Sequence, residues 1–208
     1  MPTVLTHPVV AVALAPWFRD ARERWALVAI GAACTVVPDL DVIGLRLGIP
    51  YGDPFGHRGF SHSLVFAALL ATIVTLALSW RWRRRAAPVV WAYFFLCTAS
   101  HGLLDAMTNG GLGIAFFWPF DDGRWFLQWR PIAVSPLGAP GFLAKGLAVL
   151  ASELRWVVLP AAGVFALIAS TAALTASCVA SVVSDVPPPP PPVPPDTTGL
   201  PQLPQGWV

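Results

Sequence analysis

Long apolar runs constrain the fold of this 208-residue chain more than any other feature. Three of them are long enough to cross a bilayer or nearly so, namely Ser63–Trp80, Pro88–Leu104 and Trp156–Val183. A hydrocarbon core of about 30 Å needs roughly 20 helical residues. Two shorter runs, Pro8–Trp17 and Trp25–Val37, would form tilted, half-buried or re-entrant helices covered by their neighbours. The chain is therefore predicted to be a membrane protein built from α-helices.

The composition agrees with this prediction, because 56% of the residues are hydrophobic and only 12% are charged. The first apolar run has neither a basic n-region nor an Ala-x-Ala-like cleavage site, so we do not expect a cleaved signal peptide. Residues 1–185 would form one membrane-embedded domain. We expect an all-α fold, a polytopic membrane helical bundle of about five helices, near 4–17, 25–37, 63–80, 88–105 and 156–183.

Turn formers and prolines mark the segments outside these helices. Loop 38–62 is rich in glycine and proline, which disfavours a long helix there. Within loop 106–155, residues 142–154 have apolar positions at helical spacing, which predicts an amphipathic helix at the interface. Residues 186–208 are Pro-rich and are expected to form a disordered tail outside the fold. A ligand for a proline-recognition partner is the alternative to a plain tail.

Two arginine clusters indicate the orientation in the membrane. One comprises Arg19, Arg22 and Arg24, and the other extends from Arg81 to Arg85. Short cytoplasmic loops are enriched in arginine and lysine, so both clusters are expected inside and loop 38–62 outside. Helices of the predicted lengths then bring every histidine and the key aspartates to the outer face. Beside such apolar runs the expected partner is the lipid bilayer, and no nucleic-acid partner is expected.

The few ionisable residues near the apolar runs are concentrated in short motifs. Two of the four histidines lie in His57-Arg58-Gly59-Phe60-Ser61-His62-Ser63, and His101 precedes Asp105 by one helical turn. Neutral imidazole and carboxylate are the usual ligands of zinc and similar cations in hydrolases. A hydrogen-bonded core histidine is the alternative for each one alone, above all for His7. Together they predict a divalent metal site, most simply of zinc, with ligands from His7, Asp39, Asp41, His57, His62, His101 and Asp105.

Asp39, Asp41 and Arg58 are the candidates for catalytic roles. Carboxylates at the end of a helix meet the negative end of its dipole, which a bound cation would offset, so either aspartate would be a bridging ligand or general base. The alternative for both is a solvated turn at the interface. The planar fork of Arg58 would bind a phosphate or carboxylate, unless Arg58 is a simple interface anchor. Ser61 and Ser63 are expected to cap the following helix.

Asp53 and the cysteines are predicted to have structural roles. Asp53 precedes a proline, which is an ordinary turn signal. Cys34, Cys97 and Cys178 lie inside apolar segments, are odd in number and form no Cys-x-x-Cys motif. Buried free thiols are therefore expected, without a disulfide framework or a cysteine-based zinc site.

Four motifs together resemble a known family. His7, Pro38-Asp39-Leu40-Asp41, the motif at 57–63 and His101-Gly102-Leu103-Leu104-Asp105-Ala106-Met107-Thr108-Asn109-Gly110 are similar to those of the LexA-regulated, membrane-bound, metal-dependent hydrolases of bacterial inner membranes. That family is distantly similar to zinc phospholipase C and single-strand nucleases, which use multi-zinc sites. The resemblance covers about residues 1–120, with Ser61 where threonine is expected. It implies a multi-pass protein of the bacterial inner membrane that hydrolyses a phosphoester or lipid-linked substrate.

Two other functions fit part of the pattern. One is a metal-free lipid phosphatase with His101 as nucleophile and Asp105 as its orienting partner, although no Pro-Ser-Gly-His motif occurs and Phe95 stands where such enzymes need arginine. The other is a non-catalytic membrane protein that binds or carries metal, or a structural partner. Carriage would need polar groups along a path through the helices, which are almost free of them.

The arginine distribution leads to a test of orientation. Single cysteines at Gly52 and Ala86, in a background without the three native cysteines, should differ in their reaction with an impermeant thiol reagent added from outside. Position 52 is expected to react at once, and position 86 only after the membrane is permeabilised. Labelling of position 86 but not 52 from outside would reverse the orientation.

Overall fold

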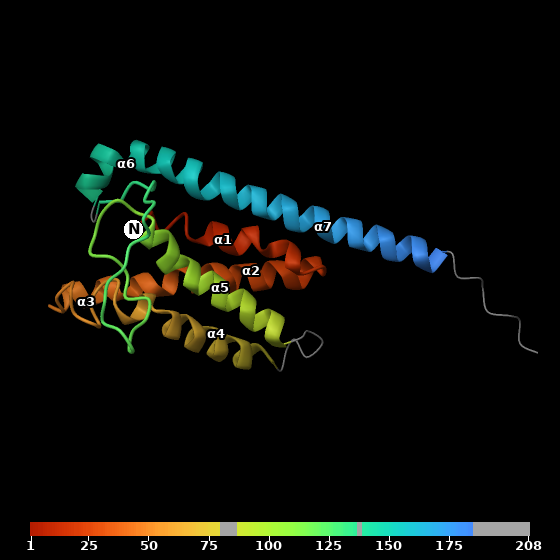
Figure 1. The fold of residues 1–208 in the computed structure, drawn as a ribbon, viewed down its shortest axis with the longest axis horizontal. Coiled ribbons are helices and arrows are strands. Elements are labelled where there is room, and N and C mark those ends of the chain that lie inside the picture. Colours follow the sequence, from red (N-terminus) through yellow and green to blue (C-terminus); the bar gives the residue numbers. More distant parts are fainter. Residues whose placement is uncertain (80–86, 137–138, 185–208) are drawn as a thin grey trace, which may run out of the picture. The chain divides into compact units, whose positions relative to one another are not determined.

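The computed structural model describes residues 1–79, 87–136 and 139–184 (Figure 1). The second arginine cluster and the Pro-rich tail lie outside these residues. The chain separates into two compact units, Met1–Ala172 and Ala173–Val208, and of the second the structure describes only the end of helix α7. The described residues form helices, irregular loops and two isolated β-bridges, Thr108–Ile132 and Ile114–Trp125.

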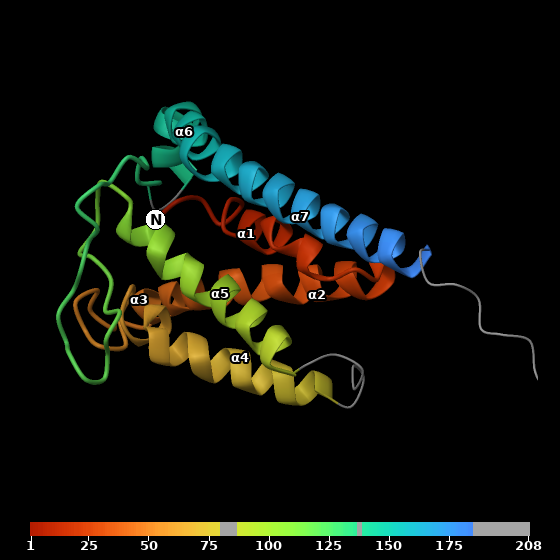
Figure 2. The ribbon, with the colours of Figure 1, turned by 45° about the vertical axis from the view of Figure 1, so that its right-hand side comes forward.

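Helices make up most of the first unit. The bundle consists of α1 (Pro8–Ala13), α2 (Ala21–Val36), α4 (Leu64–Ser79) and α5 (Ala87–Ala106), which lie side by side in both views (Figures 1 and 2). Short helical turns extend or join them: η1 (Ala15–Trp17), η2 (Val37–Asp41), α3 (Val42–Arg46) and η3 (Phe60–His62). Towards the C-terminus, one continuous helical stretch comprises α6 (Ala139–Glu153), the π-helical turn η4 (Leu154–Val158) and α7 (Leu159–Ser184).

The predicted helices are confirmed, but the second is longer than predicted. It does not end at Pro38, because the chain stays helical through η2 and α3 and gives an apolar stretch of 24 residues, Glu23–Arg46. Pro38 is tolerated in the first turn of η2, where its missing N–H would have had no helical partner. The prediction of a turn-rich loop from residue 38 is therefore wrong for residues 38–46.

The lengths of two further helices also differ from the prediction. The predicted amphipathic helix at 142–154 is confirmed as a helix, but it continues into the last span and gives Leu143–Ser177, 35 residues long. Conversely, the run Ser63–Trp80 yields α4, whose 16 residues extend about 24 Å. Among the described residues, the helices long and apolar enough to cross a membrane are Glu23–Arg46, Ala87–Ala106 and Leu143–Ser177.

The core of the bundle is centred on α5, which packs against both α2 and α4. Tyr93, Phe94 and Cys97 of α5 are fully buried. The Tyr93 hydroxyl donates a hydrogen bond to the carbonyl oxygen of Ala11 at 3.1 Å and so connects α5 to α1. Cys34 and Cys97 are buried free thiols, as predicted, whereas the side chain of Cys178 lies outside the described part of the chain.

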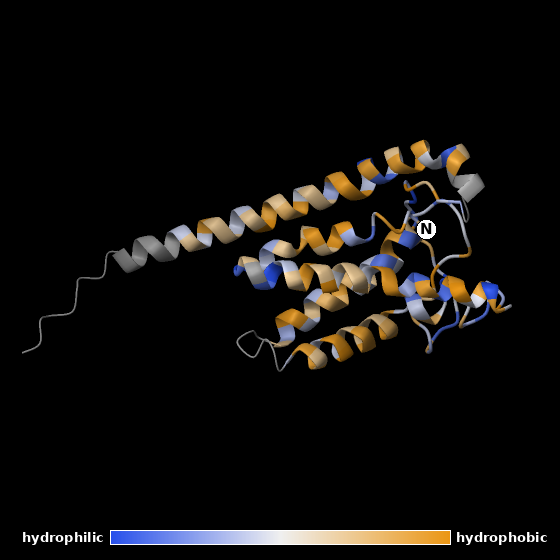
Figure 3. Cartoon of the chain, turned by 180° about the vertical axis from the view of Figure 1, so that it is seen from behind, coloured by the Kyte–Doolittle hydropathy of each residue, from blue (hydrophilic) through white to orange (hydrophobic). Residues whose placement is uncertain are grey.

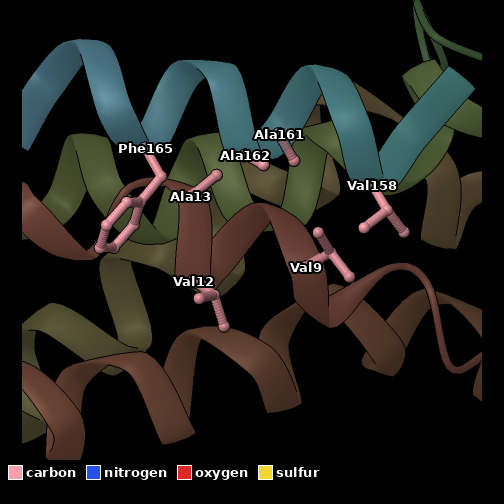
Figure 4. Close-up of a pocket in the computed structure, with 7 residues that line it drawn as sticks. All are labelled: Val9, Val12, Ala13, Val158, Ala161, Ala162 and Phe165. Carbon is pink, nitrogen blue, oxygen red and sulfur yellow. The ribbon is translucent and has the colours of Figure 1, made fainter. Parts of the chain in front are cut away.

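Apolar side chains also cover the outside of the helices. Hydrophobic residues predominate along α4 (Figure 3), where Ile73 and Leu76 are 64% and 67% exposed. Between α1 and the stretch from η4 into α7, a cavity of about 330 Å³ is lined only by apolar side chains, among them Val9, Val158 and Phe165 (Figure 4). Such surfaces are expected where lipid takes the place of water as the solvent.

Close packing of α2 on α5 can be tested at Gly31. A Cβ atom at Gly31 would lie 2.6 Å from the Tyr93 hydroxyl oxygen, and Tyr93 is buried and hydrogen-bonded. Gly31→Ala is therefore expected to lower the free energy of unfolding by about 1–3 kcal/mol. At Gly163 of α7 a Cβ would meet nothing within 4 Å, so Gly163→Ala should be neutral or stabilising by up to about 1 kcal/mol. Denaturation of the detergent-solubilised variants measures both, and a fully stable Gly31→Ala variant would contradict the packing.

Candidate metal centre

The residues predicted to form a metal site come together at one end of the bundle. They come from the residue before α1, the turn η2, the segment that leads into η3 and the last turns of α5. In Figure 1 these segments meet where the N-terminus and α3 lie. The side chains of Asp39 and Asp41 are 8% and 6% exposed. The other members are at most 4% exposed: His7, His57, His62, His101 and Asp105.

His62, His101 and Asp39 turn three ligand atoms toward one another. The Nε2 atoms of His62 and His101 are 3.1 Å apart. Asp39 Oδ1 lies 3.2 Å from His101 Nε2 and 3.8 Å from His62 Nε2. Each ring has an acceptor at its other nitrogen, since His101 Nδ1 is 2.7 Å from the Thr35 carbonyl oxygen and His62 Nδ1 is 3.2 Å from Asp41 Oδ2. With the ring protons on Nδ1, both Nε2 lone pairs face a carboxylate oxygen, an arrangement that a cation would stabilise.

His7 and Asp105 extend this group on one side. The His7 ring stacks on His101 with centroids 3.8 Å apart and planes at 18°, and His7 Nε2 is 3.9 Å from Asp105 Oδ1. Arg58 Nε lies 3.1 Å from Asp105 Oδ2, as an ion pair without hydrogen-bond geometry. Among the described residues, neither ring nitrogen of His7 and neither oxygen of Asp105 has a hydrogen-bond partner, although all four atoms are buried. Because buried polar atoms are rarely left unpaired, these atoms are available to a metal.

Asp41 and Asp39 differ in their surroundings. The oxygens of Asp41 accept hydrogen bonds from His57 Nδ1 at 2.6 Å, Ser61 Oγ at 2.6 Å and the backbone N–H of Arg58 at 3.1 Å. Both oxygens of Asp39 are buried and lack a hydrogen-bond partner in the described part of the chain. Asp41 therefore orients the histidine motif, whereas Asp39 has its lone pairs available.

Three overlapping sets of ligand atoms result, each with its atoms within 4.8 Å of one another. The sets are His7–His101–Asp105, Asp39–His62–His101 and Asp41–His57–His62, and their members are the residues predicted as ligands. Zinc ligands about 2.0–2.2 Å from the metal in tetrahedral geometry are roughly 3.3 Å apart, similar to the separations between Asp39, His62 and His101. Imidazole nitrogens and carboxylate oxygens with unpaired lone pairs thus fit zinc or a similar divalent cation.

Burial keeps His7 and His62, which lie outside the candidate spans, in the form that binds metal. Desolvation lowers the pKa of His7 well below its ordinary value, and the neighbouring His101 and His62 lower it further. Desolvation also lowers the pKa of His62, although its hydrogen bond with Asp41 acts in the opposite direction. Both rings are therefore neutral at physiological pH, and neutral imidazole is the metal-binding species.

Arg58 is buried inside the site and exposes almost no surface to its surroundings. It is 1% exposed, and besides the ion pair with Asp105 its Nη1 donates to the Gly110 carbonyl oxygen at 2.9 Å and its Nη2 to Thr108 Oγ1 at 3.3 Å. The interpretation of Arg58 as an interface anchor is therefore wrong. Its predicted contact with a substrate phosphate or carboxylate stays a prediction, and the carboxylate that it meets in the structure is Asp105.

Arg124 holds the loop of the candidate site, a role that the sequence did not predict. Its guanidinium donates to three backbone carbonyl oxygens of the preceding loop, those of His57 at 3.0 Å, Asp53 at 2.9 Å and Tyr51 at 3.2 Å. These bonds fix the loop that carries His57. No motif around Arg124 distinguishes it from other loop arginines, so no sequence signal could have identified it.

Gly102 and Thr108 were within reach of the sequence, because both belong to the motif that begins at His101. A Cβ at Gly102 would lie 2.9 Å from the carbonyl oxygen of His62, so the glycine lets α5 approach the histidine motif closely. Thr108 is buried and holds Arg58. The spacing of the motif gave no indication of these particular contacts.

The remaining polar predictions are partly confirmed. Ser63 caps α4, since its Oγ accepts a hydrogen bond from the Phe66 N–H at 3.0 Å. Ser61 is not a cap, because its hydroxyl donates to Asp41. Asp53 closes a turn by accepting from the Phe55 N–H at 2.8 Å and lies outside the three ligand sets.

Fold and site together define a multi-pass helical membrane protein with a buried histidine–aspartate cluster at one end of its bundle. The chain belongs to the YdjM inner membrane protein family, whose model matches residues 1–182. It is 37% identical over 161 residues to the inner membrane protein YbcI of Escherichia coli (strain K12), a match that covers 77% of this chain and 92% of YbcI. No solved structure matches the chain. The family confirms the predicted localisation in the bacterial inner membrane.

The packing of Arg58 can be tested at Gly111. Gly111 has φ +95°, and a Cβ there would lie 2.3 Å from Arg58 Nη1, whereas Gly48 has φ +86° and nothing within 4 Å. Alanine strains the backbone by about 1–2 kcal/mol at both positions, but only Gly111→Ala displaces Arg58. We expect Gly111→Ala to lose about 2 kcal/mol more unfolding free energy than Gly48→Ala in chemical denaturation. Equal losses would mean that the position of Arg58 does not matter for stability.

Proposed function

We propose that this protein is a membrane-bound, metal-dependent hydrolase that acts on a phosphoester or lipid-linked substrate at the outer interface of the inner membrane. The observation that carries the proposal is the pair of Nε2 atoms of His62 and His101, 3.1 Å apart and beside Asp39 Oδ1. A divalent cation would occupy the position to which these three atoms point.

The balance of charge supports a bound cation. Asp39, Asp41 and Asp105 are all nearly buried, and Arg58 is the fully buried cationic side chain in contact with them in the described part of the chain. Buried carboxylates are costly unless paired. Three carboxylates outnumber the one guanidinium, and one or more divalent ions would compensate the difference where the histidines bind as neutral ligands.

The ligand sets compete for the same nitrogen atoms. His101 belongs to two sets but offers only Nε2, because Nδ1 is hydrogen-bonded to Thr35. His62 likewise offers only Nε2 to a metal, since its Nδ1 faces Asp41. The number of ions therefore depends on which set takes each Nε2 atom, with a carboxylate such as Asp39 or Asp105 able to bridge two positions.

The chemistry follows from these positions. A bound divalent metal would lower the pKa of a coordinated water toward about 7 and polarise a phosphoryl or acyl oxygen. Asp39 is the better general base of the two predicted aspartates, because its oxygens are not engaged in hydrogen bonds. Asp41 would hold His57 and His62 in place, and Arg58 would hold Asp105 beside His7.

The membrane setting supports a lipid-linked substrate. The cluster lies where α5 ends and where the stretch Glu23–Arg46 enters η2 and α3, so the ligands are near the ends of two candidate spans. A substrate held by an apolar anchor could reach such a site without leaving the bilayer. The arginines at positions 19, 22 and 24 lie near the start of α2, at the opposite end from the cluster, and are expected on the cytoplasmic side. The end of the bundle that carries the cluster is therefore expected on the outer side. The resemblance to the LexA-regulated hydrolases agrees with the same activity.

A non-catalytic metal-binding protein is the second candidate. The observation in its favour is the complete burial of three candidate ligands, because His7, His101 and Asp105 have no exposed surface. A structural ion would need no route for substrate. Turnover of generic phosphodiester and lipid substrates by the metal-loaded protein separates the two candidates. The metal-free phosphatase gains no support, since His101 Nδ1 is bonded to Thr35 and not to the orienting carboxylate of Asp105.

The metal site is tested by its stoichiometry. His101→Ala removes a nitrogen shared by two ligand sets, and Asp105→Asn removes a charged oxygen while keeping the shape of the side chain. Both variants are expected to lose most bound metal and any hydrolysis, because ligands must be deprotonated and correctly placed. Mass spectrometry of purified proteins gives the metal content. Asp53→Asn, which keeps its turn hydrogen bond outside the cluster, is the control. Unchanged stoichiometry in both site variants would sink the proposal.

A further inference from the structure

Glu153 is a buried carboxylate outside the three ligand sets. It is the last residue of α6, is 1% exposed and lies within the candidate span Leu143–Ser177. An ionisable group at membrane depth is costly and usually marks function, with a partner that compensates it. The partner here is Thr3. The Thr3 backbone N–H donates to Glu153 Oε1, and the Thr3 hydroxyl donates to Oε2 at 2.7 Å.

From this contact we infer that Glu153 is a positioning residue that fixes the His7 ring at the metal site through Thr3 and Thr6. The Thr6 hydroxyl lies 3.0 Å from both the Thr3 hydroxyl and the Thr3 carbonyl oxygen, and the Thr6 N–H donates to that carbonyl oxygen at 3.0 Å. These bonds close a turn that ends directly before His7. The inference rests on the proposed function, because it concerns a ligand of the proposed metal.

His7 depends on its backbone for its position. Among the described residues neither ring nitrogen has a hydrogen-bond partner, and the ring stacks on His101 and lies 3.9 Å from Asp105 Oδ1. The other histidines of the site differ, since each has a hydrogen bond at Nδ1 that fixes the ring, to Asp41 for His57, to Ser61 for His62 and to the Thr35 carbonyl oxygen for His101. The turn that Glu153 holds therefore does for His7 what a direct hydrogen bond does for the other histidine ligands.

Apolar packing alone fixes this region only in part. The cavity of about 330 Å³ separates Val9 and Val12 of α1 from Val158 and Phe165 (Figure 4). The Glu153–Thr3 hydrogen bonds are thus a polar connection beside an incompletely packed apolar contact. Glu153 also directly precedes the π-helical turn η4, and such turns are frequent at functional sites.

Glu153→Gln tests this connection with little change in shape. Glu153 Oε1 accepts from the Thr3 backbone N–H, so a Gln amide oxygen can keep that bond. The amide nitrogen in place of Oε2 can only donate to the Thr3 hydroxyl, so the charge-assisted bond from that hydroxyl to the carboxylate is lost. Zinc alone, titrated into metal-free protein against a chelating indicator, should bind about tenfold more weakly to the variant. Carbethoxylation of His7 by diethyl pyrocarbonate in metal-free protein, followed by peptide mass spectrometry, should become severalfold faster because the ring is less fixed.

Ser152→Ala is the matched control on the same helix. Ser152 Oγ accepts from the Ala133 N–H at 2.8 Å and donates to the Pro131 carbonyl oxygen at 3.3 Å, so its loss disturbs a different segment. It should leave His7 reactivity and zinc affinity close to wild type. If Glu153→Gln does not fold, Thr3→Val removes the hydroxyl donor and Thr3→Ser restores it, with the same two measurements.

The outcomes separate this inference from the proposed function. A wild-type protein that binds no zinc would refute the metal site, whereas His7 reactivity would still report on positioning. Wild-type zinc affinity and His7 reactivity in Glu153→Gln, or in Thr3→Val where that pair is used, would overturn the inference. An equal effect of Ser152→Ala would also overturn it, because the change would then reflect general loosening of α6.

Discussion

The cost of burying carboxylates in an apolar bundle governs the arrangement of the polar end of this protein. Asp39, Asp41 and Asp105 are nearly inaccessible, and the groups that compensate them come from other segments of the chain. Asp105 of α5 meets Arg58 and His7, and Asp41 of η2 meets the histidine motif. The segments must therefore assemble around these charges, and the ring nitrogens of His7 and the oxygens of Asp39 and Asp105 remain without hydrogen-bond partners among the described residues.

The irregular loops at this end are possible because arginines satisfy their backbone. Arg124 covers three carbonyl oxygens of the loop that carries His57, and Arg58 covers that of Gly110. The loops also require glycine at positions where two stretches of backbone lie very close together. A Cβ at Gly56 or Gly59 would lie 2.2 Å or 2.1 Å from a backbone oxygen of the same loop. Irregular backbone near a membrane is tolerated where protein encloses it in this way.

Helix α6 is hydrogen-bonded to two segments next to the histidine–aspartate cluster. The motif resemblance covers about residues 1–120, whereas the YdjM family model extends to residue 182. The structure gives a physical reason for the longer match, because α6 holds the turn before His7 through Glu153 and the loop after α5 through Ser152. A helix that carries none of the candidate ligands is thus hydrogen-bonded to the turn directly before one of them.

The sequence by itself determined the class of fold and selected the candidate ligands, which the structure brings together. Apolar runs can be read from local windows, and in so apolar a chain the few histidines and aspartates stand out. The tertiary structure decided which aspartate has its lone pairs available, that Arg58 turns inward, and which segments Arg124 and Glu153 hold by hydrogen bonds. These contacts join residues 67 positions apart for Arg124 and His57, and 150 apart for Glu153 and Thr3. Hydrophobicity is a local property that sums along a segment, whereas a hydrogen bond depends on distances and angles that exist only after distant segments have packed.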